Sequence, residues 1–206
     1  MNKEISDKYY TILEDYSGEI KIQKSRFISN IFHLGKKEDS SLFIDRIKKK
    51  YYDAKHHPFA YRIGHDENNF RFNDDGEPSG SSGKPILDAI DKYELRDVLI
   101  VVTRYFGGIK LGVGGLKRAY FESSEECIKK SKIIEKFLCE KIRISFDYAY
   151  IGAIMNLIEK NNINIIENKS AADVNILCEL RISQIQQFEE NIINLTNGSV
   201  SINKII

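Results

Sequence analysis

Tryptophan is absent from the 206-residue sequence, and cysteine, proline and methionine are scarce, with three, three and two residues. The cysteines are Cys127, Cys139 and Cys178. An odd number of cysteines this far apart fits neither a disulfide framework nor the paired ligands of a zinc site. We therefore expect reduced thiols, and neither a metal ion nor a cofactor.

Long apolar runs are also missing, and none approaches the ~20 residues that a membrane-spanning helix needs. The residues after Met1 contain no apolar signal region, so we expect a cytoplasmic protein with no membrane partner. The formal net charge is only +1, which excludes a generally basic nucleic-acid-binding protein. Any surface for nucleic acid must then be local.

Glycine, by contrast, is concentrated in two segments that hold most of the chain's 13 glycines. The first covers residues 73–85 (NDDGEPSGSSGKP) and the second covers residues 103–120 (TRYFGGIKLGVGGLKRAY). Glycine tolerates positive φ and lets a ligand or another backbone come close. Both segments run into an expected helix start, where backbone N–H groups are free to bind an anion.

The pattern before residue 138 predicts a mixed α and β domain. A fully apolar run, Val98 to Val102, predicts a buried central strand. Residues before Thr11 are expected to form a polar lead. The other expected elements are strands within 11–34, 57–63 and 69–73, a strand or linker over 133–138, and helices over 39–53, 85–93 and 114–130.

From Glu140 the pattern restarts as strand, helix, strand, strand, helix, strand, which is the ferredoxin-like order. Ser183 is expected to cap the second helix, and Asn197-Gly198 to end it. The predicted organisation is α+β, with one domain over 1–137 and a second over 138–206.

The second glycine-rich segment does not match known phosphate loops. It lacks the Gly-Lys-Ser/Thr of a Walker loop, and its glycine spacing breaks the dinucleotide-binding fingerprint. One interpretation is a tight strand-to-helix turn. The other is a ligand-binding loop, because Arg104, Lys110, Lys117 and Arg118 are the only charged residues between Val98 and Phe121. Cations and backbone amides bind phosphate, and the neighbouring Tyr105 and Phe106 are able to stack on bases.

The first segment offers three possible chemistries. Asp74, Asp75 and Glu77 could bind Mg²⁺ or exchange protons, although they lack the calcium-loop spacing, or they could form an exposed turn or pair with Arg71 or Arg104. Ser81 and Lys84 match the short Ser-x-x-Lys acyl-transfer pattern, but its companion motifs are absent. His56 and His57 are adjacent, so on a strand they face opposite sides and do not share one metal ion.

These segments, together with Ala60-Tyr61-Arg62-Ile63, resemble the YigZ/IMPACT family. The resemblance implies an N-terminal ribosomal-protein-S5-domain-2-like α/β domain followed by a ferredoxin-like βαββαβ domain similar to domain V of elongation factor G. Eukaryotic relatives regulate translation by binding the activator of a kinase that acts on an initiation factor. Some bacterial relatives carry a proline-dipeptidase label, which no set of metal ligands in this sequence supports.

Three functions follow from this pattern. The first is a translation-linked regulatory protein that binds RNA or the ribosome through a glycine-rich basic groove. The second is a regulator that binds a protein partner through the same groove, and the third is an enzyme acting on a phosphorylated substrate. The candidate groove residues are His56, Arg71, Asp74, Asp75, Glu77, Ser79, Ser81, Lys84, Arg104, Tyr105, Phe106, Gly107, Gly108, Lys110, Gly112, Gly114, Gly115, Lys117 and Arg118.

Overall fold

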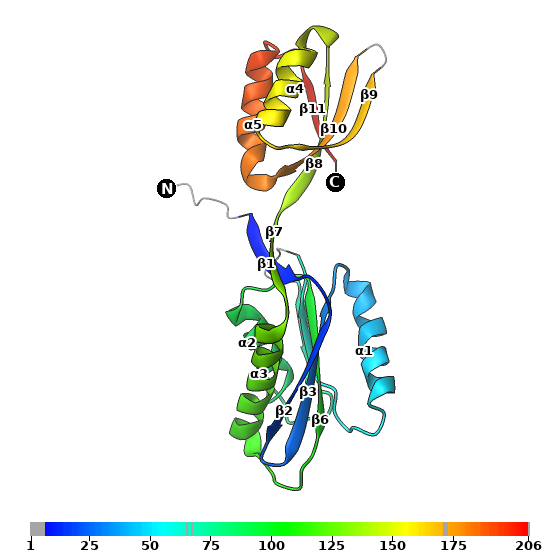
Figure 1. Cartoon of the computed structure of the whole chain (residues 1–206), viewed down its shortest axis with the longest axis vertical. Helices are drawn as coiled ribbons and strands as arrows, with labels where there is room; N and C mark the ends of the chain where they lie inside the picture. The colour runs from blue at the N-terminus through cyan, green and yellow to red at the C-terminus, as the bar shows by residue number, and fades with distance from the viewer. Residues whose placement is uncertain (1–6, 65, 67, 171–172, 206) are drawn as a thin grey trace. The chain divides into compact units, whose positions relative to one another are not determined.

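The computed structural model describes residues 7–64, 66, 68–170 and 173–205. The chain divides into two compact units (Figure 1). The N-terminal unit covers Tyr9–Lys136, and the C-terminal unit begins at Phe137 and also takes in Asp7 and Lys8. No helix in these ranges is long and apolar enough to cross a membrane.

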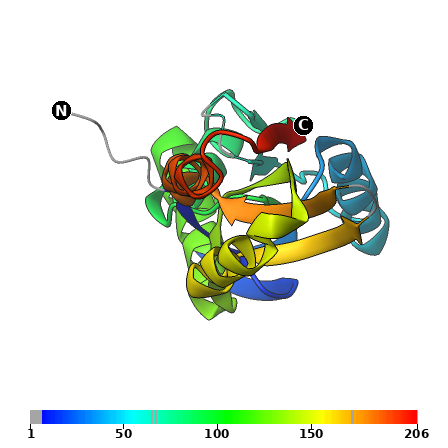
Figure 2. The same cartoon turned by 90° about the horizontal axis from the view of Figure 1, so that it is seen from above.

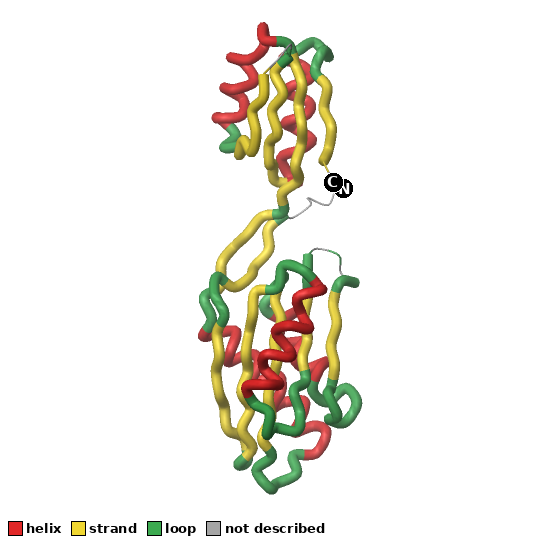
Figure 3. Tube along the Cα trace, turned by 90° about the vertical axis from the view of Figure 1, so that its right-hand side faces the viewer, coloured by secondary structure: helices red, strands yellow, loops and turns green. Residues whose placement is uncertain are grey.

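A five-stranded antiparallel sheet forms the centre of the N-terminal unit (Figure 3). Its strand order is β2-β3-β6-β4-β5. A tight turn joins β2 to β3, with Gln23 and Lys24 at φ values of 44° and 67°. The strands are β2 (Tyr16–Ile22), β3 (Ser25–His33), β4 (Phe59–Arg62), β5 (Phe70–Asn73) and β6 (Val98–Tyr105).

Both faces of this sheet are covered, which explains the unbroken apolar run in β6. Val98, Ile100 and Val102 belong to the core under α2 (Gly83–Lys92) and α3 (Gly112–Lys130). Leu99 and Val101 belong to the core under α1 (Ser40–Lys50) on the other face. Because successive strand residues point to opposite faces, a central strand between two helical layers must be apolar throughout.

Several expected boundaries are wrong by a few residues. β6 runs on to Tyr105 because its backbone stays paired with β3, Arg26 lying opposite Tyr105. α2 begins at Gly83 and α3 at Gly112, each two residues before the expected start. The residues before Thr11 do not all form a polar lead. Lys8–Ile12 is strand β1, which pairs with β7 (Ile133–Phe137).

The C-terminal unit has the expected order of strands and helices. Its sheet order is β11-β8-β10-β9, and α4 (Ile151–Lys160) and α5 (Ile182–Leu195) lie on one face of it (Figure 2). Ser183 is not the helix cap, because the helix begins one residue earlier, at Ile182. The Ser183 hydroxyl instead donates to the Asp7 carboxylate. The strands are β8 (Cys139–Phe146), β9 (Asn164–Ser170), β10 (Val174–Arg181) and β11 (Ser201–Ile205).

Candidate nucleotide-binding surface

Asp74 organises the first glycine-rich segment. Its carboxylate accepts hydrogen bonds from the backbone N–H of Gly80, Ser82 and Gly83 at 2.8, 3.0 and 2.9 Å, and from the Ser82 hydroxyl at 2.8 Å. Burial raises the pKa of this carboxyl, but these hydrogen bonds outweigh the burial, so the pKa lies below its ordinary value. Asp74 therefore closes the loop and satisfies free N–H groups at the start of α2.

Asp75 connects the same segment to α1 and to the histidine pair. Its carboxylate accepts from Lys48 Nζ at 2.9 Å and from the backbone N–H of His57 at 2.7 Å. Burial raises the pKa of Asp75, but the bonds from Lys48 and His57 lower it by more, so the pKa lies below its ordinary value. The carbonyl of Asp75 lies 2.9 Å from His56 Nδ1. Asp75 is thus held by contacts within its own chain.

Glu77 forms a buried polar cluster with two residues that come from β6 and α3. Its Oε1 accepts from Arg104 Nη1 and from the Tyr120 hydroxyl, both at 2.7 Å. The side chains of Glu77 and Arg104 are 4% and 8% exposed. Burial, with the nearby Glu77 carboxylate, raises the pKa of Tyr120 well above its ordinary value. This cluster fastens the first glycine-rich segment against the second.

The glycines of the second segment have separate causes. A Cβ at Gly107 would lie 2.1 Å from the backbone carbonyl of Lys24, so the β2–β3 turn requires glycine there. Gly108 and Gly112 have φ values of 85° and 69°, in the left-handed region that favours glycine. Together they turn the chain from the end of β6 into the start of α3.

A pocket of about 690 Å³ lies where the two segments meet, and we call it the loop pocket. Its wall contains exposed apolar groups, with Phe106 and Val113 at 59% and 51% exposure. It lies entirely within the N-terminal unit. Its lining residues are Asp53, Ala54, Lys55, His56, Glu77, Pro78, Arg104, Tyr105, Phe106, Lys110, Leu111, Gly112, Val113 and Leu116.

The structure brings only part of the expected groove into this pocket. Seven expected residues line it: His56, Glu77, Arg104, Tyr105, Phe106, Lys110 and Gly112. Twelve do not, and they are Arg71, Asp74, Asp75, Ser79, Ser81, Lys84, Gly107, Gly108, Gly114, Gly115, Lys117 and Arg118.

The structure places five of these twelve residues elsewhere. Arg71 lies on the edge strand β5 and interacts with Tyr61 across the strand pair. Ser81 is fully buried, and Lys84 pairs with Asp88 one helical turn away, so Ser-x-x-Lys does not form a nucleophile and base. Lys117 and Arg118 are exposed on α3 outside the pocket.

The acidic groups at the loop pocket are already bound within the chain, whereas two lysines are not. Asp53 accepts a 2.7 Å hydrogen bond from the Tyr105 hydroxyl, a bond that, together with burial, raises the pKa of Tyr105 to about 12. Glu77 is held by Arg104. Lys55 and Lys110 have no ion pair within the described residues. The pocket therefore favours a negatively charged ligand.

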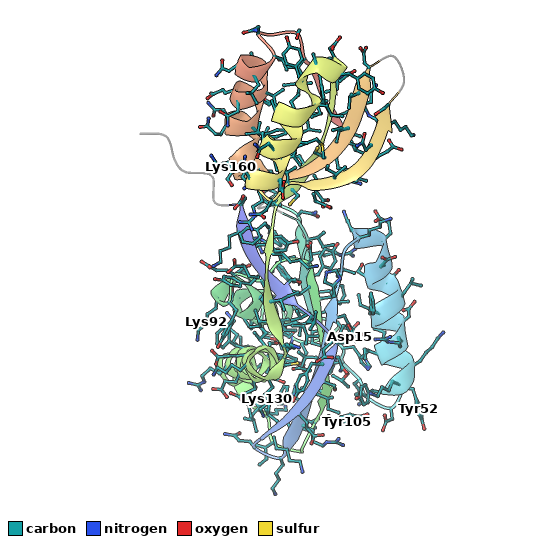
Figure 4. The ribbon with its side chains drawn as sticks, turned by 45° about the horizontal axis from the view of Figure 1, so that its top comes forward. Asp15, Tyr52, Lys92, Tyr105, Lys130 and Lys160 are labelled. Atoms are coloured by element: carbon teal, nitrogen blue, oxygen red, sulfur yellow. The ribbon has the colours of Figure 1, made fainter. Side chains whose placement is uncertain are left out.

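The aromatic residues at this end of the unit come from several segments. Figure 4 labels Tyr105, at the end of β6, and Tyr52, just after α1, at the same end of the N-terminal unit. Tyr52 is 85% exposed. Arg104 lies against the Phe106 ring, with 5.6 Å between the guanidinium carbon and the ring centroid. An exposed aromatic surface beside cations is typical of proteins that bind single-stranded nucleic acid.

Comparison with known proteins identifies the family of this chain. Residues 23–128 match the Impact N-terminal domain, and residues 144–199 match DUF1949, a domain of unknown function. The IMPACT family member YvyE of Bacillus subtilis is 38% identical over 194 residues, covering 94% of this chain and 89% of that protein. The chain belongs to the IMPACT family. The expected resemblance is thereby confirmed, and both glycine-rich segments lie inside the first matched domain.

Other IMPACT relatives extend the similarity over both units. A family member from Haemophilus influenzae is 32% identical and covers 89% of this chain and 90% of that protein. A solved structure titled "Crystal structure of an hypothetical protein" superimposes with a TM-score of 0.69 at 26% identity. It covers 98% of this chain and 99% of that one. The similarity thus extends over the residues of both units.

Proposed function

We propose that this IMPACT family protein is a translation-linked regulatory protein that binds RNA, free or in the ribosome, through the loop pocket and the surface around it. The link to translation comes from the family that the chain belongs to. The observation that supports RNA is that the exposed Phe106 lines the same pocket as the unpaired Lys55 and Lys110, and Lys110 lies just before α3. Aromatic faces stack on bases, while cations and free backbone N–H groups bind phosphates.

The described strands of the C-terminal sheet present no exposed aromatic side chain. Single-stranded RNA on a sheet of this topology is commonly held by exposed aromatic side chains. Among strands β8 to β11 the single aromatic residue is Phe146, which is 2% exposed in the core. We therefore assign RNA binding to the N-terminal unit.

The test is a titration of single-stranded RNA at several salt concentrations. The variant Lys55→Ala/Lys110→Ala should weaken binding and reduce the slope of log K against log salt by about 1.4, since each lost phosphate contact contributes ~0.7. The matched control is Lys129→Ala/Lys130→Ala, which removes the same charge from lysines already paired with Glu125 and Glu126. Equal slopes in the two variants would remove the loop pocket from RNA binding.

A protein partner is the second candidate. It is favoured by the apolar groups around the pocket, where Phe106, Ile109 and Val113 are 59%, 43% and 51% exposed. Apolar exposure of this kind also marks protein interfaces. A partner held by these groups would stay bound at high salt, and Phe106→Ala would release it, whereas the double lysine variant would not.

A further inference from the structure

We propose that the loop pocket is a site for one nucleotide unit, with the phosphate at the start of α3 and the base against Phe106. The inference rests on the proposed RNA binding and specifies which part of the RNA the pocket binds. It requires that a free nucleoside monophosphate also binds there.

The phosphate end of the site is the first turn of α3. Leu111 precedes the helix without a capping hydrogen bond from its side chain, and no acidic residue lies in the first turn. The first N–H groups of the helix have no intrahelical acceptor, and the helix dipole favours an anion there. Gly112 and Val113 line the pocket, and Lys110 adds its charge just before the helix.

Arg104 gives a second and independent reason to expect an anion. Its side chain is 8% exposed and lines the pocket, and only Nη1 is used on Glu77. Its buried Nε–H has no acceptor within the described residues. Buried donors in folded proteins are nearly always satisfied. A phosphate oxygen in the pocket would supply the missing acceptor.

The base end of the site is apolar and aromatic. Phe106 presents an exposed ring, and Pro78, Val113 and Leu116 form an apolar wall in the same pocket. The pocket volume of about 690 Å³ lies within the roughly 300–1,000 Å³ typical of small-molecule sites. An inorganic anion alone would leave this wall exposed to water, whereas a base would cover it.

The test compares adenosine 5′-monophosphate, adenosine and inorganic phosphate by calorimetric titration of the full-length protein. We expect the monophosphate to bind more tightly than either part alone. Phe106→Ala should reduce the affinity for the monophosphate and leave the affinity for phosphate nearly unchanged.

The diagnostic variant is Val113→Asp. Its carboxylate would occupy the phosphate position, and an acid in the first turn suits the helix dipole, so the fold should be retained. Monophosphate affinity should fall at least tenfold. The matched control, Ile151→Asp, makes the same change at the first residue of α4, where Ile151 is 37% exposed, and should leave binding unchanged.

The outcomes separate this inference from RNA binding itself. Tight monophosphate binding that Val113→Asp abolishes and RNA displaces would support it. Salt-dependent RNA binding without monophosphate binding, unaffected by Val113→Asp, would overturn it and leave the proposed function standing. Binding of neither ligand would overturn both.

Discussion

Single acidic residues in the first glycine-rich segment act as internal acceptors. Asp74 binds four donors, Asp75 binds Lys48 and His57, and Glu77 binds Arg104 and Tyr120. A carboxylate that already accepts this many hydrogen bonds is poorly placed to bind Mg²⁺ or to exchange protons with a substrate. Of the three, only Glu77 lines the loop pocket, and because Arg104 holds it, the charges of that wall left unpaired within the described residues are those of Lys55 and Lys110.

We expect His57 to make the free energy of unfolding depend on pH between 7 and 5. Burial lowers the pKa of His57, although its contacts with the Tyr51 carbonyl and Asp75 act in the opposite direction. In the unfolded chain the side chain titrates near pH ~6.5. As the pH falls from 7 to 5, the unfolded state therefore binds a proton that the folded state resists, and the free energy of unfolding decreases.

Replacing this residue should remove that dependence. In His57→Gln the side-chain amide is able to donate to the Tyr51 carbonyl but does not titrate, so its unfolding free energy should change less between pH 7 and 5. Urea unfolding at both pH values measures the difference. Parallel losses in the wild type and in His57→Gln would show that another group is responsible.

The sequence predicted the residues with strong local signals and missed those placed by tertiary contacts. Arg104, Tyr105, Phe106 and Lys110 could be found because they adjoin the glycines. Asp53 and Lys55 carry no such signal. They lie just before His57, whose backbone N–H donates to the Asp75 carboxylate, a contact that joins segments far apart in the chain.

The turn between β6 and α3 shows how one element sets the position of another. Gly107 lies against the backbone of Lys24 in the β2–β3 turn, and its N–H bonds to Ser25 Oγ at 3.2 Å. Gly114 lies two residues into α3, where an added Cβ would meet no described atom within 4 Å beyond its chain neighbours and its own helix backbone. Packing therefore requires glycine at Gly107, whereas it does not at Gly114.

These two glycines should respond oppositely to the same substitution. Gly107→Ala should destabilise the fold by at least about 2 kcal/mol, because backbone atoms cannot move aside as a side chain can. Gly114→Ala should stabilise α3 by up to about 1 kcal/mol and raise the melting temperature by a few degrees. Thermal unfolding followed by circular dichroism tests both. A destabilised Gly114→Ala would mean that this position is constrained within the fold.

At the element scale, periodicity predicted the types of the helices and strands but not their ends. α2 starts two residues early because the Asp74 carboxylate accepts from its first N–H groups, a contact made across nine residues of chain. β6 runs past its apolar run because β3 continues to pair with it. Both boundaries depend on a partner that the local pattern does not reveal.

For the whole molecule, the two units have separate cores. The buried residues of the C-terminal core lie within 142–192, and those of the N-terminal cores lie within 12–128. The loop pocket and all its lining residues belong to the N-terminal unit. A cut between Lys136 and Phe137 should therefore give two fragments that each fold, of which only the N-terminal one carries the loop pocket.

Residues 9–136, expressed alone, should unfold cooperatively and keep the RNA affinity of the full chain within about threefold. The physical reason is that the fragment retains both sheet faces, α1 to α3 and the complete loop pocket. Residues 137–206 should fold around their own core but bind the same RNA much more weakly, because the described strands β8 to β11 expose no aromatic ring. Urea unfolding and RNA titration of both fragments measure this. A folded 9–136 fragment that has lost RNA binding, beside a 137–206 fragment that has kept it, would place the RNA surface in the C-terminal unit.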